Sequence, residues 1–297
     1  MKIYDCFMFF DEEMLLDLRL NIMDKYVDKF VITEATYMHS GKSKKLIFDI
    51  NKFSKFKDKI IYIIVDTPPA TLLEINNKEN LNEQESKKTI NAKKRELYQI
   101  EKTQDGIVDA NEEDIIIVSD LDEIPNLEKI NLKNINEKLI FFKQKMYYYK
   151  LNLFYNLMPW YGSKACKKKY FKSPQWLRSI KNKKYSKWRL DILFSKEKYS
   201  DIHYVEDGGW HFTNMRNPED LEKKLSNFLH HVDYEQSGID LKDLKKLMKE
   251  KKIMYNHNID KKDSKWGEGA KLETIKLKDM PKYIEDNFEK YKSWLDI

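Results

Sequence analysis

The stretch Asp114-Ile-Ile-Ile-Val-Ser-Asp120-Leu-Asp122-Glu-Ile-Pro125 decides the fold that we expect for this chain of 297 residues. Its apolar run, residues 115–118, is short, β-branched and closed by polar residues, which is typical of a buried strand in a parallel sheet. Ligands of open α/β sheets bind beyond the carboxyl ends of such strands. Asp120 and Asp122 therefore fall where a site is expected, and two carboxylates at this spacing can hold Mg²⁺ or Mn²⁺. A solvated polar turn explains the same residues equally well, because D-x-D alone is a weak motif.

The segments on either side extend this pattern. Apolar runs at residues 2–10, 30–32 and 60–65 predict further strands, and helices are predicted between them and over about 87–105. This β-α-β-(loop/α)-β-α-β order predicts an α/β fold with a mostly parallel, Rossmann-like sheet flanked by helices. The last part of the chain has helical periodicity, so we expect a main domain of residues 1–235 and a helical C-terminal extension, residues 236–297, packed on it.

Composition limits the class of protein. Hydrophobic residues make up 41% of the chain, which excludes a disordered protein, and the net charge of +6 favours an anionic ligand without requiring nucleic acid. Two cysteines, Cys6 and Cys166, are too few for a disulfide framework, so a reducing compartment is expected. No apolar run reaches the ~18–20 residues that span a bilayer, and no signal peptide precedes the first strand. We therefore expect a soluble, cytoplasmic protein.

Three groups of residues could meet in one site. The first is the Asp120/Asp122 pair, the second is the Gly208–His211 segment, and the third is Asn91 with Arg95, which share a helix face because they are four residues apart. If they meet, Asp120, Asp122 and His211 would bind a divalent metal that stabilises charge on a leaving diphosphate.

The remaining roles in such a site follow from side-chain chemistry. Arg95 and the lysines of the 37–45 loop, Lys42 among them, would contact phosphate. A carboxylate close to Gly208 would deprotonate the acceptor hydroxyl. The candidate aromatic side chains for stacking on a sugar are those of Trp210, Tyr148 and Trp160.

Each of these features has a simpler explanation. His211 can be a hydrogen-bonded core histidine, and the two glycines can be only a turn. The basic and aromatic stretch of residues 164–189 can be a solvated face, a contact with an acceptor or a membrane surface, or the binding surface of a non-catalytic nucleic-acid-binding protein. A haloacid-dehalogenase-type phosphatase also uses D-x-D, but on its first strand, and usually with Thr or Val where this chain has Ile124.

Several segments, in the same order along the chain, resemble glycosyltransferase family 17, whose best-known members are β-1,4-mannosyl-glycoprotein N-acetylglucosaminyltransferases. The segments that carry the resemblance lie between residues 3 and 230: Ile3-Tyr-Asp-Cys-Phe-Met-Phe-Phe10, Val31-Ile-Thr-Glu-Ala35, His39-Ser-Gly-Lys42, Ser119-Asp-Leu-Asp-Glu-Ile-Pro125, Gly208-Gly-Trp-His-Phe212, and Ser226, Phe228 and His230.

This resemblance implies a GT-A fold and an inverting transfer from a sugar nucleotide, expected to be UDP-N-acetylglucosamine, to a glycan or glycolipid acceptor. It implies that Asp122 is the principal metal ligand, that Asp120 lies nearer the ribose and the metal, and that Glu34 and His39 belong to the donor site. For the catalytic base we rank Asp207 first, Glu206 second and Glu123 third, from their positions. A family member that binds the donor without turnover is an alternative.

The chain also departs from animal members of that family. They carry an N-terminal membrane anchor and a Golgi address, neither of which is expected here, so a protein N-glycan is not the expected acceptor. The heavy use of Lys, Ile and Asn is typical of a microbial or viral source. We expect no nucleic-acid partner, and the basic stretch of residues 164–189 is a candidate for peripheral membrane contact.

Overall fold

The computed structural model describes residues 1–183, 185–186, 188–189, 191, 194–195, 197–227, 231–255 and 269–297. Its strands are β1 (Ile3–Phe9), β2 (Lys29–Ala35), β3 (Ile60–Val65), β4 (Ile115–Val118), β5 (Glu123–Pro125), β6 (Leu139–Tyr148), β7 (Leu153–Trp160), β8 (Lys164–Lys167), β9 (Ile202–Thr213) and β10 (Glu273–Thr274). Its α-helices are α1 (Glu13–Met23), α2 (Leu81–Glu101), α3 (Pro174–Ser179), α4 (Pro218–Leu225), α5 (His231–Ser237), α6 (Leu241–Lys249), α7 (Lys282–Asp286) and α8 (Phe288–Tyr291).

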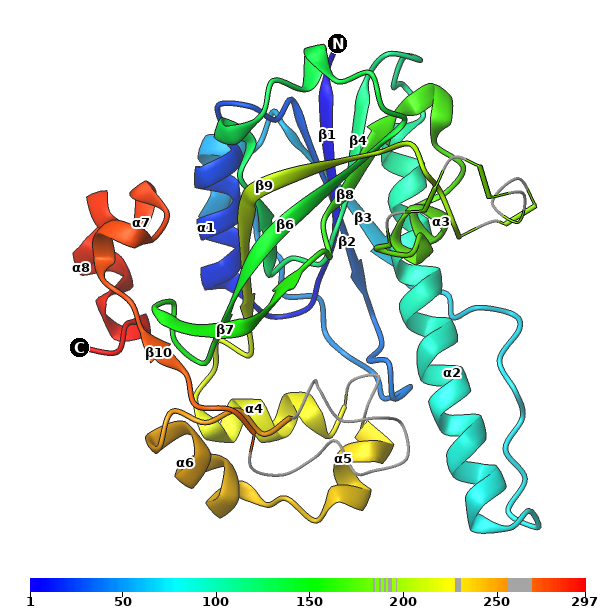
Figure 1. Cartoon of the computed structure of the whole chain (residues 1–297). Coiled ribbons are helices and arrows are strands. Elements are labelled where there is room, and N and C mark those ends of the chain that lie inside the picture. Colours follow the sequence, from blue (N-terminus) through cyan, green and yellow to red (C-terminus); the bar gives the residue numbers. More distant parts are fainter. Residues whose placement is uncertain are drawn as a thin grey trace.

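The strands form one mixed sheet with the order β10-β7-β6-β8-β4-β1-β2-β3 (Figure 1). Strands β4, β1, β2 and β3 run parallel to one another, as predicted from the four apolar runs. Strand β8 then joins β4 and β6 in antiparallel fashion, and β9 pairs with both β6 and β5. The predicted α/β fold with helices on both sides of the sheet is confirmed, and the sheet is mixed and largely parallel.

Helices cover both faces of the parallel strands, which explains why these strands have apolar runs without alternation. Because successive side chains of a strand point to opposite faces, Phe7 and Phe9 pack with α1 while Tyr4 and Cys6 face the other side. The second face is covered by α2, through Ile100, and by α3. In Figure 1, α1 and α2 accordingly lie on opposite sides of the strands.

The C-terminal part packs on the sheet in two places. The first is a cluster that joins β6 and β7 to α4 and α6 and contains Tyr148, Tyr155, Leu221 and Leu244. The second joins α7 and α8 to the core beside α1, through the buried side chains of Ile284 and Tyr291. None of the helices in the described ranges is long and apolar enough to cross a membrane.

Two predicted helix boundaries are wrong. The helix predicted over about 87–105 begins at Leu81, because the Asn80 side chain caps it by accepting a hydrogen bond from the Glu83 amide at 3.0 Å. The helix ends at Glu101, short of the predicted 105, and Gly106 lies within the 3₁₀ turn that follows, where a Cβ would lie 2.4 Å from a Val31 methyl group. Helix α4 begins at Pro218 and ends at Leu225, and residues 228–230 lie outside the described residues.

Candidate active site

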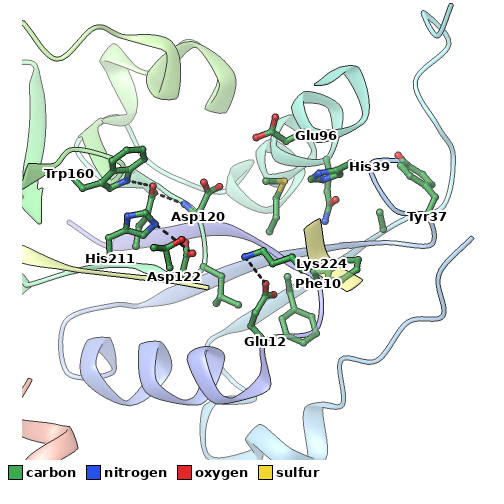
Figure 2. Close-up of a pocket in the computed structure, with 17 residues that line it drawn as sticks. Phe10, Glu12, Tyr37, His39, Glu96, Asp120, Asp122, Trp160, His211 and Lys224 are labelled. Carbon is green, nitrogen blue, oxygen red and sulfur yellow. Dashed lines mark hydrogen bonds and ion pairs between the residues drawn. The ribbon is translucent and has the colours of Figure 1, made fainter. Parts of the chain in front are cut away.

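A cavity of about 250 Å³ lies at the carboxyl ends of β1, β2 and β4 (Figure 2). The ends of β1 and β2, the following loop and α2 supply one part of its wall, and the Asp120–Glu123 turn, β7, β9 and α4 supply the rest. The lining residues are Met8, Phe9, Phe10, Glu12, Ala35, Tyr37, His39, Glu96, Gln99, Asp120, Leu121, Asp122, Glu123, Trp160, His211, Thr213 and Lys224.

The turn after β4 is held by Arg19, a fully buried arginine of α1. The guanidinium group makes a bidentate ion pair with the buried Asp5 carboxylate, at 2.6 and 2.8 Å. It also donates hydrogen bonds to the main-chain oxygens of Asp120, Leu121 and Glu123, at 2.9, 3.2 and 2.8 Å. Since these carbonyls belong to consecutive parts of the turn, one side chain fixes the backbone that carries both aspartates.

Glu123 braces the same turn from the other side. One of its carboxylate oxygens accepts a hydrogen bond from the Asp120 amide at 2.8 Å, and the other accepts one from Trp160 Nε1 at 2.6 Å. Space for this carboxylate depends on Gly162, because a Cβ there would lie 1.8 Å from Glu123 Oε1. These contacts give Glu123, our third candidate for the base, a supporting role in the turn.

Asp122 and His211 face one another in the cavity. His211 Nε2 lies 3.6 Å from Asp122 Oδ2, and the imidazole stacks on the Trp160 ring at a centroid distance of 4.9 Å. Burial lowers the pKa of His211, but the adjacent Asp122 carboxylate outweighs this effect and the pKa is raised. Burial likewise raises the pKa of Asp122, but the charge of His211 outweighs it, so that pKa is lowered. The two side chains therefore stabilise each other in their charged forms.

Asp120 is held by Arg178 of α3. Arg178 Nη2 donates to Asp120 Oδ2 at 2.8 Å, and Nη1 lies 3.6 Å from Glu96 Oε1. Asp120 Oδ1 is buried and has no hydrogen-bond partner among the described residues. Burial raises the pKa of Asp120 to about 7, with further increases from Glu123 and Asp122 that Arg178 opposes. An unsatisfied buried carboxylate oxygen of this kind is suited to a cation.

The donor set of Asp120, Asp122 and His211 fits Mn²⁺ or Mg²⁺ in its chemistry. Within the described ranges, however, no three His, Cys, Asp or Glu side chains are gathered as a ready metal site. Mg²⁺ in proteins is usually bound by one or two carboxylates together with water and substrate phosphates. The residues present fit a metal of this kind, completed by a phosphorylated ligand.

Two further residues predicted for the site also line the cavity. Trp160 does so through the ring that stacks on His211, and His39 does so from the loop after β2. Burial lowers the pKa of His39, so its imidazole is neutral. The backbone oxygen of His39 accepts a hydrogen bond from Arg95 Nη1 at 2.9 Å. Arg95, which we expected to contact phosphate, therefore positions the His39 loop and does not line the cavity.

The other residues predicted to bind the donor also lie outside the cavity wall. Glu34 is buried, and its carboxylate pairs with Lys44 and accepts hydrogen bonds from Tyr62 and from two main-chain amides. The Asn91 amide exchanges two hydrogen bonds with the backbone of Leu73, at 2.7 and 2.8 Å. Lys42 is exposed. These contacts give Glu34 and Asn91 roles in holding loops.

The residues predicted as base candidates lie on another surface. Glu206 and Asp207 are 70% and 68% exposed, and they pair with Lys143 at 2.7 Å and Lys145 at 3.5 Å. Neither lines the cavity that contains Asp122. Their role as base stays a prediction, and this placement does not support it.

Two of the expected acceptor-binding residues also lie elsewhere. Tyr148 is buried in the cluster with α4 and α6, and Trp210 is partly buried against the main core.

Several lysines of the basic 164–189 stretch make contacts within the chain. Lys164 is buried and donates to the carbonyls of Arg178 and Ile180, at 2.5 and 2.7 Å, and Lys167 and Lys169 pair with Glu113. Lys184 lies outside the described residues.

Sequence reasoning missed several residues of the site. They are Arg19, which supports the turn, Arg178, which pairs with Asp120, and the cavity-lining residues Glu12, Tyr37, Glu96, Gln99 and Lys224. Two of them had a signal in the sequence: Arg19 lies between Leu18 and Leu20 in the leucine-rich part of α1, and Lys224 shares a helical face with Leu221. Ser226 lies at the end of α4, whereas Phe228 and His230 lie outside the described residues.

Comparison with known proteins agrees with this geometry. No protein with a curated function matches the chain. The model of the family described as Glycosyltransferase family 17 matches residues 1–296, which include every element that builds the cavity. The match therefore covers nearly the whole chain, and it confirms the resemblance that the ordered motifs indicated. The protein belongs to glycosyltransferase family 17, and it is a glycosyltransferase.

Proposed function

We propose that the protein is a metal-dependent, inverting glycosyltransferase of the GT-A type. It moves a sugar, N-acetylglucosamine, from a UDP-sugar to a hydroxyl group of a glycan or glycolipid acceptor. One observation carries the proposal: the Asp122–His211 pair and the unsatisfied Oδ1 of Asp120 lie in one cavity at the carboxyl ends of parallel strands. The parallel β4-β1-β2-β3 order supports the GT-A type.

In this proposal Asp122 is the principal metal ligand, and Asp120 Oδ1 and His211 Nε2 are the further protein ligands. The bound metal supplies positive charge where the leaving diphosphate becomes more negative. Arg19 and Glu123 keep the turn in place, because each holds its backbone through hydrogen bonds. The nucleoside is assigned to the other end of the cavity, where Tyr37, His39 and Gln99 offer aromatic and polar groups.

The transfer breaks the bond between the sugar's anomeric carbon and the β-phosphate oxygen, and UDP leaves with the bonding electrons. The acceptor oxygen forms the new bond from the opposite face, which inverts the anomeric configuration, and its proton passes to a base. The sequence predicts Asp207 or Glu206 as that base, but both are exposed and lie outside the cavity. Glu12 is the carboxylate that we test against them, because it lines the cavity, where Arg216 Nη2 lies 2.8 Å from its Oε1.

The test is a thermal-shift panel of sugar nucleotides with and without Mn²⁺. A ligand at about 100 times its Kd stabilises the native state by about 2.7 kcal/mol, which raises Tm by several degrees. We expect UDP-sugars to give this shift only with Mn²⁺, and Asp122→Ala to abolish it. Asp58→Asn is the control, because Asp58 is exposed and does not line the cavity. Absence of a shift with every nucleotide in the wild-type protein would refute the proposal.

Catalysis is tested separately, by release of UDP from the donor that gives the largest shift. Removal of metal with EDTA should stop this release, and added Mn²⁺ should restore it. Glu12→Gln is compared with Asp207→Asn and Glu206→Gln at saturating donor. The base is the residue whose amide variant loses turnover while it keeps the thermal shift with the donor.

A further inference from the structure

Lys224 is a lysine on the inward face of a helix. It belongs to α4, where Leu221 is fully buried one turn earlier, so these two side chains share a face. The Lys224 side chain is only 16% exposed and points into the cavity (Figure 2). Its neighbour Lys223 is exposed on the outer side of the helix. Lysine is seldom buried to this extent unless it meets a negative charge.

The charges of the cavity wall are strongly unequal. Five carboxylate side chains line it. Among the lining residues that the structure describes, Lys224 is the one lysine, and none is an arginine. The carboxylates are those of Glu12, Glu96, Asp120, Asp122 and Glu123. Arg178 pairs with Asp120 and Glu96, Lys93 with Glu96 and Arg216 with Glu12, and a divalent metal would compensate two further charges, but a diphosphate would add negative charge. A lysine that faces the ligand would therefore favour its binding.

Lys224 forms a long ion pair with Glu12 in the cavity wall. Its Nζ lies 4.0 Å from Glu12 Oε1, which is longer than a hydrogen bond. The same carboxylate is bound by Arg216, whose Nη2 lies 2.8 Å from Oε1. Glu12 therefore keeps a cationic partner when the Lys224 ammonium group turns to another anion. Lys224 and Asp122 line the same cavity, so the ammonium group faces the ligand space beside the proposed metal site.

The end of α4 is tied to the opposite wall of the cavity. The Ser40 amide donates a hydrogen bond to the Asn227 carbonyl at 3.2 Å, directly beyond the last turn of the helix. This bond joins α4 to the loop that carries His39, which we assign to the nucleoside end. Lys224 therefore lies on an element that is anchored next to both parts of the proposed donor site.

We propose that Lys224 binds the diphosphate of the nucleotide donor and turns from Glu12 to the phosphate oxygens when the donor enters. This inference rests on the proposed function, because it specifies how the same cavity holds its donor. An ammonium group is a compact donor that suits phosphate as a point charge. As UDP leaves, the same contact stabilises the charge that develops on the β-phosphate.

The experiment measures the binding of UDP and of uridine, in Mn²⁺, by calorimetry. Loss of hydrogen bonds to a charged group predicts a roughly 10- to 100-fold weaker Kd for UDP in Lys224→Met. Uridine has no phosphate, so its Kd should not change. Lys223→Met is the matched control from the outer face of the same helix and should bind both ligands as the wild-type protein does. Lys224→Arg keeps the charge and should retain most of the affinity for UDP.

Two results would overturn the inference alone: unchanged UDP binding by Lys224→Met, or an equal loss for UDP and uridine, which would indicate a structural role. Failure of the wild-type protein to bind UDP would instead overturn the proposed function, and this inference with it. A melting curve without ligand separates both cases from misfolding, and Lys224→Arg decides the question where Lys224→Met does not fold.

Discussion

Replacement of Arg19 tests whether the fold and the site depend on the same contact. This side chain is fully buried, pairs with Asp5 through two hydrogen bonds, and binds three carbonyls of the turn that carries Asp120 and Asp122. Arg19→Met removes all of these bonds and leaves the Asp5 carboxylate buried without its cation. Arg19→Lys keeps the charge but cannot reproduce the planar fork that reaches the carboxylate and the carbonyls together.

The expected loss of stability follows from these contacts. Removal of one partner of a buried ion pair costs about 3–5 kcal/mol. Three carbonyls also lose a charged donor, but their bonds share one guanidinium group and their contributions do not add in full. We therefore expect about 4–6 kcal/mol for Arg19→Met. Small domains have about 5–15 kcal/mol in total, so Arg19→Lys, with an expected loss of about 2–3 kcal/mol, is the more useful variant.

The assay is urea unfolding followed by circular dichroism, with Mn²⁺ binding measured on the same samples. Arg19→Lys should lower the unfolding midpoint and weaken Mn²⁺ binding, because the turn that presents the carboxylates is loosened. Arg189→Met is the control: Arg189 is about half exposed and pairs with the nearby Asp191, and exposed pairs contribute little. A wild-type midpoint and unchanged Mn²⁺ binding in Arg19→Lys would refute the reasoning.

Three other predictions concern the cavity and its surroundings. Trp160→Phe removes the indole donor to buried Glu123 and should lower the free energy of unfolding by about 1–3 kcal/mol, measured by urea unfolding. Asp207→Asn and Glu206→Gln should keep near-normal turnover in a UDP-release assay, because both side chains are exposed and lie outside the cavity; a large loss would restore them as base candidates. Without metal, the raised pKa of Asp120, about 7, makes the folded state retain a proton that the unfolded chain loses near pH 4. This stabilisation should disappear as pH rises from about 4 to about 7, and Asp120→Asn should lack that part of the slope in urea titrations with EDTA.

The parallel half of the fold could be predicted because strands buried on both faces leave continuous apolar runs. Strand β8 of the antiparallel half could not be predicted in the same way. Strand β8 reads Lys164-Ala-Cys-Lys167 and looked like part of a basic surface stretch. Lys164 is nevertheless buried, since its long stem crosses the core and its ammonium group reaches the carbonyls of Arg178 and Ile180 at the end of α3. Charge alone therefore gave the wrong exposure for this residue.

Motifs placed Asp120, Asp122 and His211 together, and the structure brings them into one cavity. The residues that motifs missed reach the cavity from elements far apart in the chain. Arg178 comes from α3 and Lys224 from α4, and each meets its partner only because the sheet and helices bring those elements together. Side chains of this kind carry no local pattern except polarity on a buried helix face. Such a pattern identifies a candidate side chain, but it does not identify the residue with which that side chain pairs.

Gly208 and Gly209 belong to the motif that resembles the family, but they do not line the cavity. A Cβ at Gly209 would lie 2.1 Å from the carbonyl oxygen of Ile124, so only glycine lets β9 approach β5 this closely. The resulting pairing sets His211 opposite Glu123, and the Phe212 amide donates to the Asp122 carbonyl at 2.8 Å. His211 is only two positions after Gly209, so a displaced strand would move the imidazole away from Asp122. Gly209 is thus needed for the distance between His211 and Asp122, because the close approach of β9 to β5 sets that distance.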